Sequence, residues 1–360
     1  MSTHRPRTPL DPARNPSAGP KAEGVAAALA GPTPIPGLHH VTAIARDPRQ
    51  NLDFYRGLLG LRLVKKTVNF DDPGTHHLYY GDAAGSPGSI MTFFPWPGAR
   101  RGQVGTGQTS ATSFSVPEAS LAYWRARLAE HGVEVSEVER FGEAVLRFRD
   151  PDGLGLELVA SSGEGDGREP WAGEDVSREV AIRGFDGVSL LLAEHDATAT
   201  LLTEVMGFRR VGESEGRLRY ESGAGGSGTR VDLVDGSAQD RGRGGAGTVH
   251  HVAFRNTDDP AQEAWRRRLG EILLWSTEVK DRQYFHSIYF REPGGVLFEM
   301  ATDPPGFGFD EPLDQLGTRL RLPPWLEPER ERIESALPAL GPVPAEALPD
   351  DGERGAKGGR

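Results

Sequence analysis

Residues 37–60 read GLHHVTAIARDPRQNLDFYRGLLG, which is the pattern of a buried strand followed by a helix. The first nine residues are mostly apolar or β-branched around a histidine doublet, so we expect a strand there. Asp47 can cap a helix whose first residue is Pro48, and Gly60 can end it. The runs LRLVKKTVNF, HHLYYGD and SIMTFFPW follow, each rich in strand-forming residues and separated by turn residues. The segment is therefore predicted to fold as β-α-β-β-β.

Three later segments repeat this plan and open with the strands SATSFSV, FDGVSLLLA and TVHHVAFRN. In the last of them, Asp259, Pro260 and Gly270 repeat the signals for the start and end of a helix. Repeats of one unit predict a fold assembled from copies of that unit. We expect an α+β protein with four βαβββ modules, paired into two domains whose curved mixed sheets surround a metal-binding cavity.

Glycine-, proline- and charge-rich breaks between the segments set the predicted boundaries. The first domain is predicted to contain modules 37–98 and 109–160, and the second domain modules 180–235 and 246–302. Residues 161–179 are predicted to be a linker and 303–340 a C-terminal extension. Residues 1–36 and 341–360 have no sustained apolar period, so both tails are predicted to be disordered.

The composition excludes several classes of protein. The 360 residues carry 41 basic and 52 acidic side chains, a net charge of −11, which argues against a nucleic-acid surface. Cysteine is absent, so any metal must be held by His, Asp or Glu. No apolar stretch reaches the roughly 18 residues of a membrane span, and the N-terminus lacks the apolar core of a signal peptide. We expect a cytoplasmic protein.

Two histidine doublets, His39-His40 and His250-His251, occupy the same place on the opening strands of segments one and four. Side chains alternate across a strand, so one member of each doublet should face the inside of the curved sheet. We expect His40 and His251 to be the inward pair. The third doublet, His76-His77, is predicted to have one solvent-facing member.

The closing strands supply a carboxylate. Matching the Pro and Gly of EPGGVLFEMATD and DPDGLGLELVAS places Glu299 opposite Glu157. The histidine positions of segments two and three are predicted to be Ser113 and Gly187, so Glu157 has no imidazole companion and is expected to be a vestige or a rim charge. In the closing strand of segment one, Phe93 is predicted to occupy the position that Glu299 occupies in segment four. One site with three protein ligands remains, namely His40, His251 and Glu299.

Two His and one carboxylate leave open positions on a metal, and this is how non-haem Fe(II) binds an organic substrate and O₂ together. Zinc accepts the same ligands for hydrolysis, so the ligand set leaves the metal open. A fourth protein ligand would instead suit isomerase chemistry.

The sequences GLHHVTAI, TVHHVAF and DRQYFHSIYFREPGGVLFEMATD, with the fourfold β-α-β-β-β layout, resemble the vicinal oxygen chelate superfamily. Within it, about residues 37–340 look like the ring-cleaving (hydro)quinone dioxygenases related to 2,6-dichlorohydroquinone 1,2-dioxygenase. The resemblance implies Fe(II), sometimes Mn(II), at the positions matching His40, His251 and Glu299, with O₂ as co-substrate. It also implies a second layer of functional residues at positions matching His39, Thr42, His250, Arg282 and Tyr289.

Physical roles can be assigned beside that resemblance. Arg282 can neutralise an anionic substrate oxygen or form a structural ion pair. Tyr289 can donate a hydrogen bond or simply pack, and His250 can take the proton that a phenol loses on binding. Tyr284 and His286 are candidates to line the entrance.

Phe307 and Phe309, in the extension, are spaced to place two rings on one side of the chain. They can shield the metal from water or cover an apolar edge of a sheet.

The sequence therefore predicts an Fe(II)-dependent ring-cleaving dioxygenase that inserts O₂ into a hydroquinone or catechol-like ring. Two alternatives stay open: a glyoxalase-type metal-dependent isomerase or lyase, and a resistance protein that binds an aromatic compound without turnover. The predicted partner is a small aromatic substrate, with no nucleic acid and no membrane. A homo-oligomer is left open.

Overall fold

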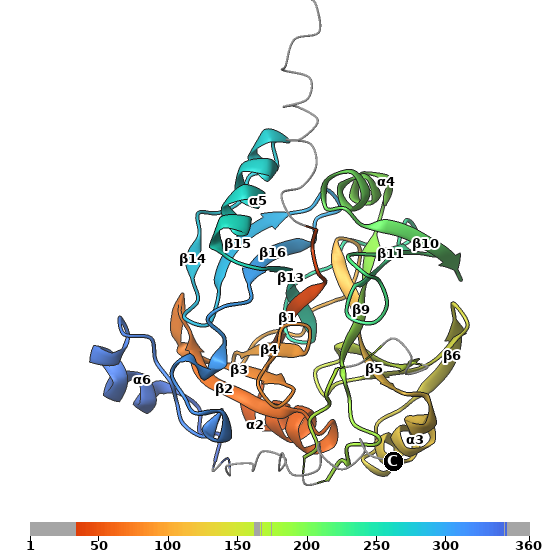
Figure 1. Cartoon of the computed structure of the whole chain (residues 1–360). Coiled ribbons are helices and arrows are strands. Elements are labelled where there is room, and N and C mark those ends of the chain that lie inside the picture. Colours follow the sequence, from red (N-terminus) through yellow and green to blue (C-terminus); the bar gives the residue numbers. More distant parts are fainter. Residues whose placement is uncertain (1–33, 162–165, 167, 174, 342, 344–360) are drawn as a thin grey trace, which may run out of the picture.

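The computed structural model describes residues 34–341 and 343, apart from residues 162–165, 167 and 174. These residues form two curled mixed sheets of eight strands each, with short helices on their outer sides (Figure 1). The α+β fold predicted from the four repeats is confirmed. Most of the two predicted tails lies outside the described residues, but Ile35 is buried in the main core, so the packed chain begins before residue 37.

The first sheet unites segments one and four, which appear in orange and in teal to blue in Figure 1. Its strands, in spatial order, are β14 (Lys280–Asp281), β15 (His286–Arg291), β16 (Leu297–Thr302), β13 (Thr248–Asn256), β1 (Leu38–Ala45), β4 (Ile90–Pro95), β3 (Asp72–Gly81) and β2 (Arg62–Asn69). We call this sheet the first half-barrel.

The second sheet unites segments two and three. Its strands, in spatial order, are β10 (Arg209–Ser214), β11 (Arg217–Glu221), β12 (Arg230–Asp235), β9 (Gly184–Leu192), β5 (Gln108–Pro117), β8 (Gly155–Ser161), β7 (Glu143–Arg149) and β6 (Ser136–Arg140). We call it the second half-barrel.

Sheet membership therefore differs from the predicted domains, which joined segment one to two and segment three to four. The opening strands of segments one and four pair antiparallel with each other, and so do those of segments two and three. The boundary between residues 160 and 180 thus does not separate the sheets. As a division into independently folding domains, it stays a prediction.

The helices lie where the capping signals predict them, with one shift. Asp47 accepts hydrogen bonds from the amides of Arg49 and Gln50 and caps α2 (Pro48–Leu52), which continues as the π-helical turn η1 (Asp53–Leu58). The cap of α5 (Asp259–Glu271) is Asp258 rather than Asp259, because the Asp258 side chain accepts from the Ala261 amide, and Gly270 lies inside the helix. The remaining elements are η2 (Glu118–Ser120), α3 (Leu121–Glu130), α4 (Asp196–Thr200), η3 (Leu201–Val205), η4 (Phe307–Phe309), η5 (Leu313–Gln315), η6 (Glu327–Glu329) and α6 (Arg330–Ala336).

The central strands of both sheets carry β-bulges at equivalent places. Between β1 and β13 the pairing register shifts at His39 and again at His250, so each of these residues is the extra one in its strand. Between β5 and β9 the shifts fall at Ser110 and Asp186. Each opening strand thus has a bulge. The residue after the bulge is His40 in β1, Ala111 in β5, Gly187 in β9 and His251 in β13.

The predicted linker packs against the sheets where it is described. Trp171 is buried. The Arg62 guanidinium lies over the Trp171 ring, with Cζ 5.0 Å from the ring centre. Asp166 accepts a hydrogen bond from Ser115 of β5 and pairs with Arg168. Among the described residues, no helix is long and apolar enough to cross a membrane.

Candidate metal centre

Three buried side chains meet on the inner face of the first half-barrel. His40 comes from β1, His251 from β13 and Glu299 from β16. The Nε2 atoms of the two histidines lie 3.2 Å apart, and Glu299 Oε2 lies 3.2 Å from His40 Nε2 and 2.9 Å from His251 Nε2. The structure thus brings together the three residues that the sequence predicted as ligands.

The neighbouring histidines of the doublets hold the inner ones. His39 Nδ1 lies 2.9 Å from His40 Nδ1, and His250 Nδ1 lies 2.8 Å from His251 Nδ1. In each pair, one nitrogen donates and the other accepts. A proton on Nδ1 of the inner ring leaves its Nε2 lone pair facing Glu299, which is the tautomer that a metal ligand requires. The bulges at His39 and His250 explain how adjacent residues of a strand can touch in this way.

The charge state of the cluster also suits a metal. Burial lowers the pKa of His251 below its usual value, although Glu299 opposes this shift. Burial raises the pKa of Glu299, but the two facing imidazoles outweigh burial and hold it well below its usual range. The Ser287 hydroxyl donates to Glu299 Oε1, whereas Oε2 is buried and has no hydrogen-bond donor. An ionised carboxylate therefore faces two imidazole nitrogens.

These observations fit a divalent cation. Donors bound about 2.0 to 2.2 Å from one ion lie roughly 3 Å from each other, which matches the spacing of the three atoms. Two imidazoles and one carboxylate accept Fe(II), Mn(II) or Zn(II). Within the described residues, this is the only group of three His or acidic side chains with such spacing.

A cavity of about 230 Å³ opens beside the cluster. Arg282 and Tyr289 form one wall, where Arg282 Nε donates to the Tyr289 hydroxyl over 3.1 Å and Nη2 pairs with Asp71 at 2.9 Å. Burial raises the pKa of Tyr289, and nearby Glu299 adds to that shift, so the phenol stays protonated and able to donate. The other lining residues are His40, Asn69, Phe70, His77, Tyr79, Phe94, Trp96, His250, His251 and Phe285.

Two further lining residues, His77 and Tyr79, belong to a hydrogen-bonded chain that the sequence did not predict. Tyr79 contacts His77 Nδ1 at 2.8 Å through its hydroxyl, and His77 Nε2 lies 2.7 Å from the Thr92 hydroxyl. Thr92 in turn contacts the Thr42 hydroxyl at 2.9 Å. His77 was expected only as part of a doublet with one solvent-facing member, yet it lines the cavity, and His76 bonds to the Pro338 carbonyl. The alternation of His77 and Tyr79 on β3 was the available signal.

The strand register corrects two sequence matches. In segment four, Glu299 pairs with Ala253, which lies two residues after His251. In segment one, the residue two after His40 is Thr42, and its strand partner is Thr92. The counterpart of Glu299 is therefore Thr92 and not Phe93. Phe93 instead packs against Tyr55 on the other face.

In segment two, Glu157 pairs with Ser113, so the histidine position there is Ala111 and not Ser113. Glu157 is buried and bonded to Ser113 and Arg140, so it is not a rim charge. Both errors arose because a match of sequence patterns does not report which residues pair between the opening and closing strands.

The candidates for the entrance lie elsewhere. Tyr284 is buried and donates to Asp310, and His286 pairs with Asp259 outside the cavity, whereas Phe285 lines it. Phe307 packs on Tyr79 and Tyr284, so it covers the sheet behind the cavity wall. Phe309 is mostly exposed.

Residues 37–158 match the family model of the Glyoxalase/Bleomycin resistance protein/Dioxygenase superfamily. The chain is 50% identical over 301 residues, 84% of its length and 95% of the relative, to "Putative ring-cleaving dioxygenase MhqO" of Bacillus subtilis. It is 36% identical over 309 residues, 84% of its length and 96% of the relative, to "Chlorohydroquinone/hydroquinone 1,2-dioxygenase" of Sphingobium indicum. The chain belongs to this superfamily and, within it, to the ring-cleaving dioxygenase family.

A solved structure supports the same placement. The crystal structure of a "putative dioxygenase" from Bacillus subtilis has 48% sequence identity and a TM-score of 0.81, and the match covers 86% of this chain and 99% of that chain. The vicinal oxygen chelate fold that the sequence resemblance implied is therefore confirmed.

Proposed function

We propose that the protein is an Fe(II)-dependent dioxygenase that cleaves the ring of a hydroquinone and inserts both atoms of O₂. The observation that carries this proposal is the cluster of His40, His251 and Glu299, which offers three ligands, with no fourth among the described residues, beside a small aromatic-lined cavity. The relative named for chlorohydroquinone and hydroquinone cleavage supports the choice of substrate class.

A metal held by these three residues retains positions for two guests, and iron supplies the electrons that activate O₂ when it is bound. Mn(II) accepts the same ligands and is the second candidate metal. Thr92 stands at the fourth position, but its hydroxyl is already engaged by Thr42 and His77. This arrangement disfavours the glyoxalase-type isomerase alternative.

The protein side chains would bind and orient the ring. Phe94, Trp96 and Phe285 give the cavity flat apolar walls for an aromatic guest. A hydroquinone has para hydroxyls, so the metal can take one of them and another group must hold the second. Arg282 carries a fixed positive charge on the cavity wall and can hold an oxygen that becomes anionic.

Two groups can handle protons. Burial lowers the pKa of His250 to about 3, so this ring is neutral at neutral pH and can accept a hydrogen bond from an arriving phenol. Tyr289 can donate a hydrogen bond to substrate oxygen from the wall of the cavity.

The test is oxygen uptake by the chain reconstituted with Fe(II) under anaerobic conditions and then given hydroquinone and air. We expect one O₂ consumed per hydroquinone and a ring-opened product that carries both atoms of labelled O₂. Conversion to benzoquinone, or tight binding without O₂ uptake, would contradict the proposal. Resorcinol, with meta hydroxyls, is the control substrate and should react far more slowly.

A further inference from the structure

The second half-barrel keeps the plan of the first but replaces its functional residues. After the bulges stand Ala111 and Gly187 instead of histidines, so the inner face has no imidazole at these two places. The carboxylate is retained as Glu157. The strand partner of Glu299 is Tyr289, and the strand partner of Glu157 is Arg147. A metal site has thus been replaced by a face that carries guanidinium groups.

Two guanidinium groups, those of Arg140 and Arg217, act on Glu157. Arg140 is buried and donates through Nη2 to Glu157 at 2.6 Å, while its Nε and Nη1 have no hydrogen-bond partner among the described residues. Arg217 donates to the Ser189 hydroxyl at 2.7 Å and has no carboxylate partner. Burial, followed by the charge of Arg140, lowers the pKa of Arg217. Arg140 and Arg217 thus share Glu157, and Asp232, the other acid that acts on Arg217, is already paired with Arg219.

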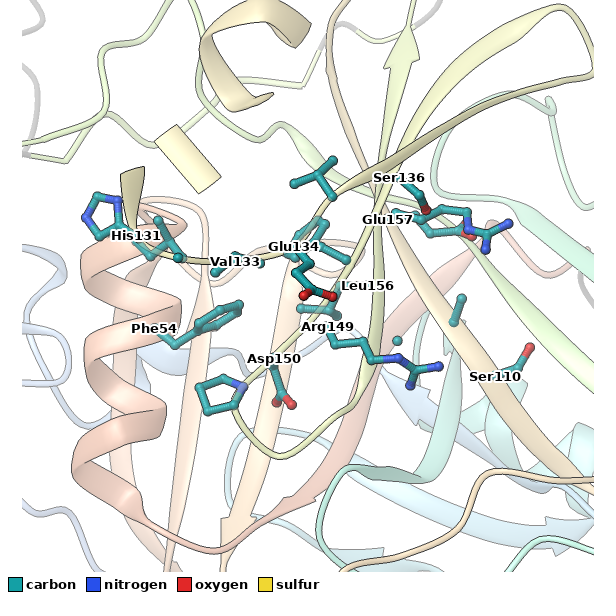
Figure 2. A pocket seen from close by; sticks show the side chains of 18 of the residues that line it. Phe54, Ser110, His131, Val133, Glu134, Ser136, Arg149, Asp150, Leu156 and Glu157 are labelled. Carbon is teal, nitrogen blue, oxygen red and sulfur yellow. The ribbon is translucent and has the colours of Figure 1, made fainter. Parts of the chain in front are cut away.

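A cavity of about 820 Å³ borders this cluster (Figure 2). Arg147, Arg149 and Arg217 all line it, and Arg147 and Arg149 lie on the same face of β7. Arg149 donates to the Gly153 carbonyl, and within the described chain no carboxylate pairs with any of the three. On the other side, the lining is partly apolar, with Phe54, Leu58, Val133, Val135, Phe148 and Pro151.

Most acids that line the same cavity are already engaged. Glu157 is held by Arg140, and Asp53 pairs with Arg49 at 2.8 Å. Asp150 accepts from the Tyr55 hydroxyl and from two backbone amides. Glu134 is exposed and has no such partner. The cavity lining thus holds three arginines without a carboxylate partner and one carboxylate, Glu134, without a cationic partner. The resulting excess of positive charge favours an anionic ligand.

We propose that the second half-barrel binds a small organic carboxylate, with its negative oxygens against Arg147, Arg149 and Arg217 and its carbon skeleton against the apolar wall. Guanidinium groups without a carboxylate partner favour a planar anion that accepts several hydrogen bonds. The size of the cavity and its apolar side favour an organic acid over an inorganic ion. This site is independent of the metal centre and of the reaction proposed for it.

The test measures binding of phthalate to the full chain by titration calorimetry at constant ionic strength, with its neutral diamide and inorganic phosphate as comparison ligands. We expect saturable binding of phthalate, none of the diamide, and weaker binding of phosphate. R147Q and R217Q should each weaken phthalate binding about tenfold. The Arg147 side chain is exposed and makes no hydrogen bond in the described structure, so R147Q should fold normally even if R217Q does not.

R267Q, which changes an exposed arginine of α5, is the matched control and should bind phthalate as the wild type does. H251A should also keep the affinity, because the metal centre lies in the other half-barrel. The proposal is overturned if phthalate does not bind, if the diamide binds equally well, or if phosphate alone binds. It is also overturned if H251A loses binding while R147Q retains it.

Discussion

His39 and His250 illustrate how single residues position the metal centre. Each is the extra residue of a β-bulge, and each touches Nδ1 of the inner histidine that follows it. The bulge keeps one imidazole facing Glu299 and a second one behind it. A regular strand would instead turn the second ring to the opposite face. The doublet in the sequence is therefore one functional unit rather than one ligand and a spare neighbour.

The chain Tyr79, His77, Thr92 and Thr42 makes a prediction at the same scale. H77L removes the partner of two hydroxyls that have almost no exposure, those of Tyr79 and Thr92. An unpaired buried hydroxyl costs about 1 to 3 kcal/mol, so urea unfolding should show a loss of that size. Metal content should stay unchanged, since His77 contacts no proposed ligand. T92V, which takes the same partner from the Thr42 hydroxyl and from His77 Nε2, is the comparison and should cost a similar amount.

The convergence of the His40, His251 and Glu299 side chains could be predicted from the sequence, because the doublets and the closing-strand motif recur at the same place in repeats. The counterparts of these residues could not be predicted. Thr92 and Ala111 were displaced in the match by one or two positions, because a pattern match does not report which residues pair between the opening and closing strands. The contacts within each doublet were missed because the pattern does not show a bulge.

At the scale of elements, the C-terminal extension is tied to β2 by a buried ion pair. Lys65 has no exposure, and its Nζ lies 2.5 Å from Glu311 and 2.6 Å from Asp310. The same segment places Phe307 against Tyr79, which lines the cavity. The extension therefore supports one wall of the candidate site.

E311A should reveal this support. It leaves the buried Lys65 ammonium with one carboxylate fewer, and breaking a buried pair costs about 3 to 5 kcal/mol. We expect a loss near the lower end of that range in chemical unfolding, because Asp310 remains. E331A, at an exposed position of α6, should change stability by less than about 0.5 kcal/mol. Equal stability of the two variants would show that the extension is not held by this pair.

The turn that precedes β8 carries a pH-dependent group. Burial raises the pKa of Asp150 to about 6, against its ordinary value of 3.8. The folded chain then holds this proton more tightly than the unfolded chain, so the stabilising contribution is present below about pH 4 and is lost as the pH rises through about 6. D150N keeps the shape of the side chain and removes the titration.

The measurement is the unfolding free energy of the wild type and D150N at pH 5 and pH 7.5. The wild type should lose stability relative to D150N between the two values. A constant difference would mean that Asp150 titrates at its ordinary pKa.

At the scale of the whole molecule, the two sheets show how the four repeats divide their tasks. Segments one and four, 211 residues apart at the contact of His40 with His251, build the half-barrel with the metal centre. Segments two and three build the arginine-lined one. The glycine-, proline- and charge-rich breaks predicted that sequence neighbours share a domain. Pairing of the opening strands instead joins segment one to four and segment two to three, and the histidine doublets already indicated that segments one and four meet.

A metal shared by such distant strands should stabilise the fold as a whole, because it binds the folded chain and not the unfolded one. Removal of the metal with a chelator should lower the melting temperature by several degrees, and added Fe(II) should restore it. The melting temperature of H251A should not respond to the chelator. A wild-type protein that melts at the same temperature with and without chelator would argue against a metal at the junction of β1, β13 and β16.

The most direct measurement is the metal content of the purified chain and of three variants. We expect about one divalent ion per wild-type chain, almost none in H251A and E299A, and the wild-type amount in E157A, whose carboxylate belongs to the second half-barrel. Circular dichroism should show that all four proteins remain folded. Equal metal loss in E157A, or full metal content in H251A and E299A, would contradict the assignment of the metal to the first half-barrel.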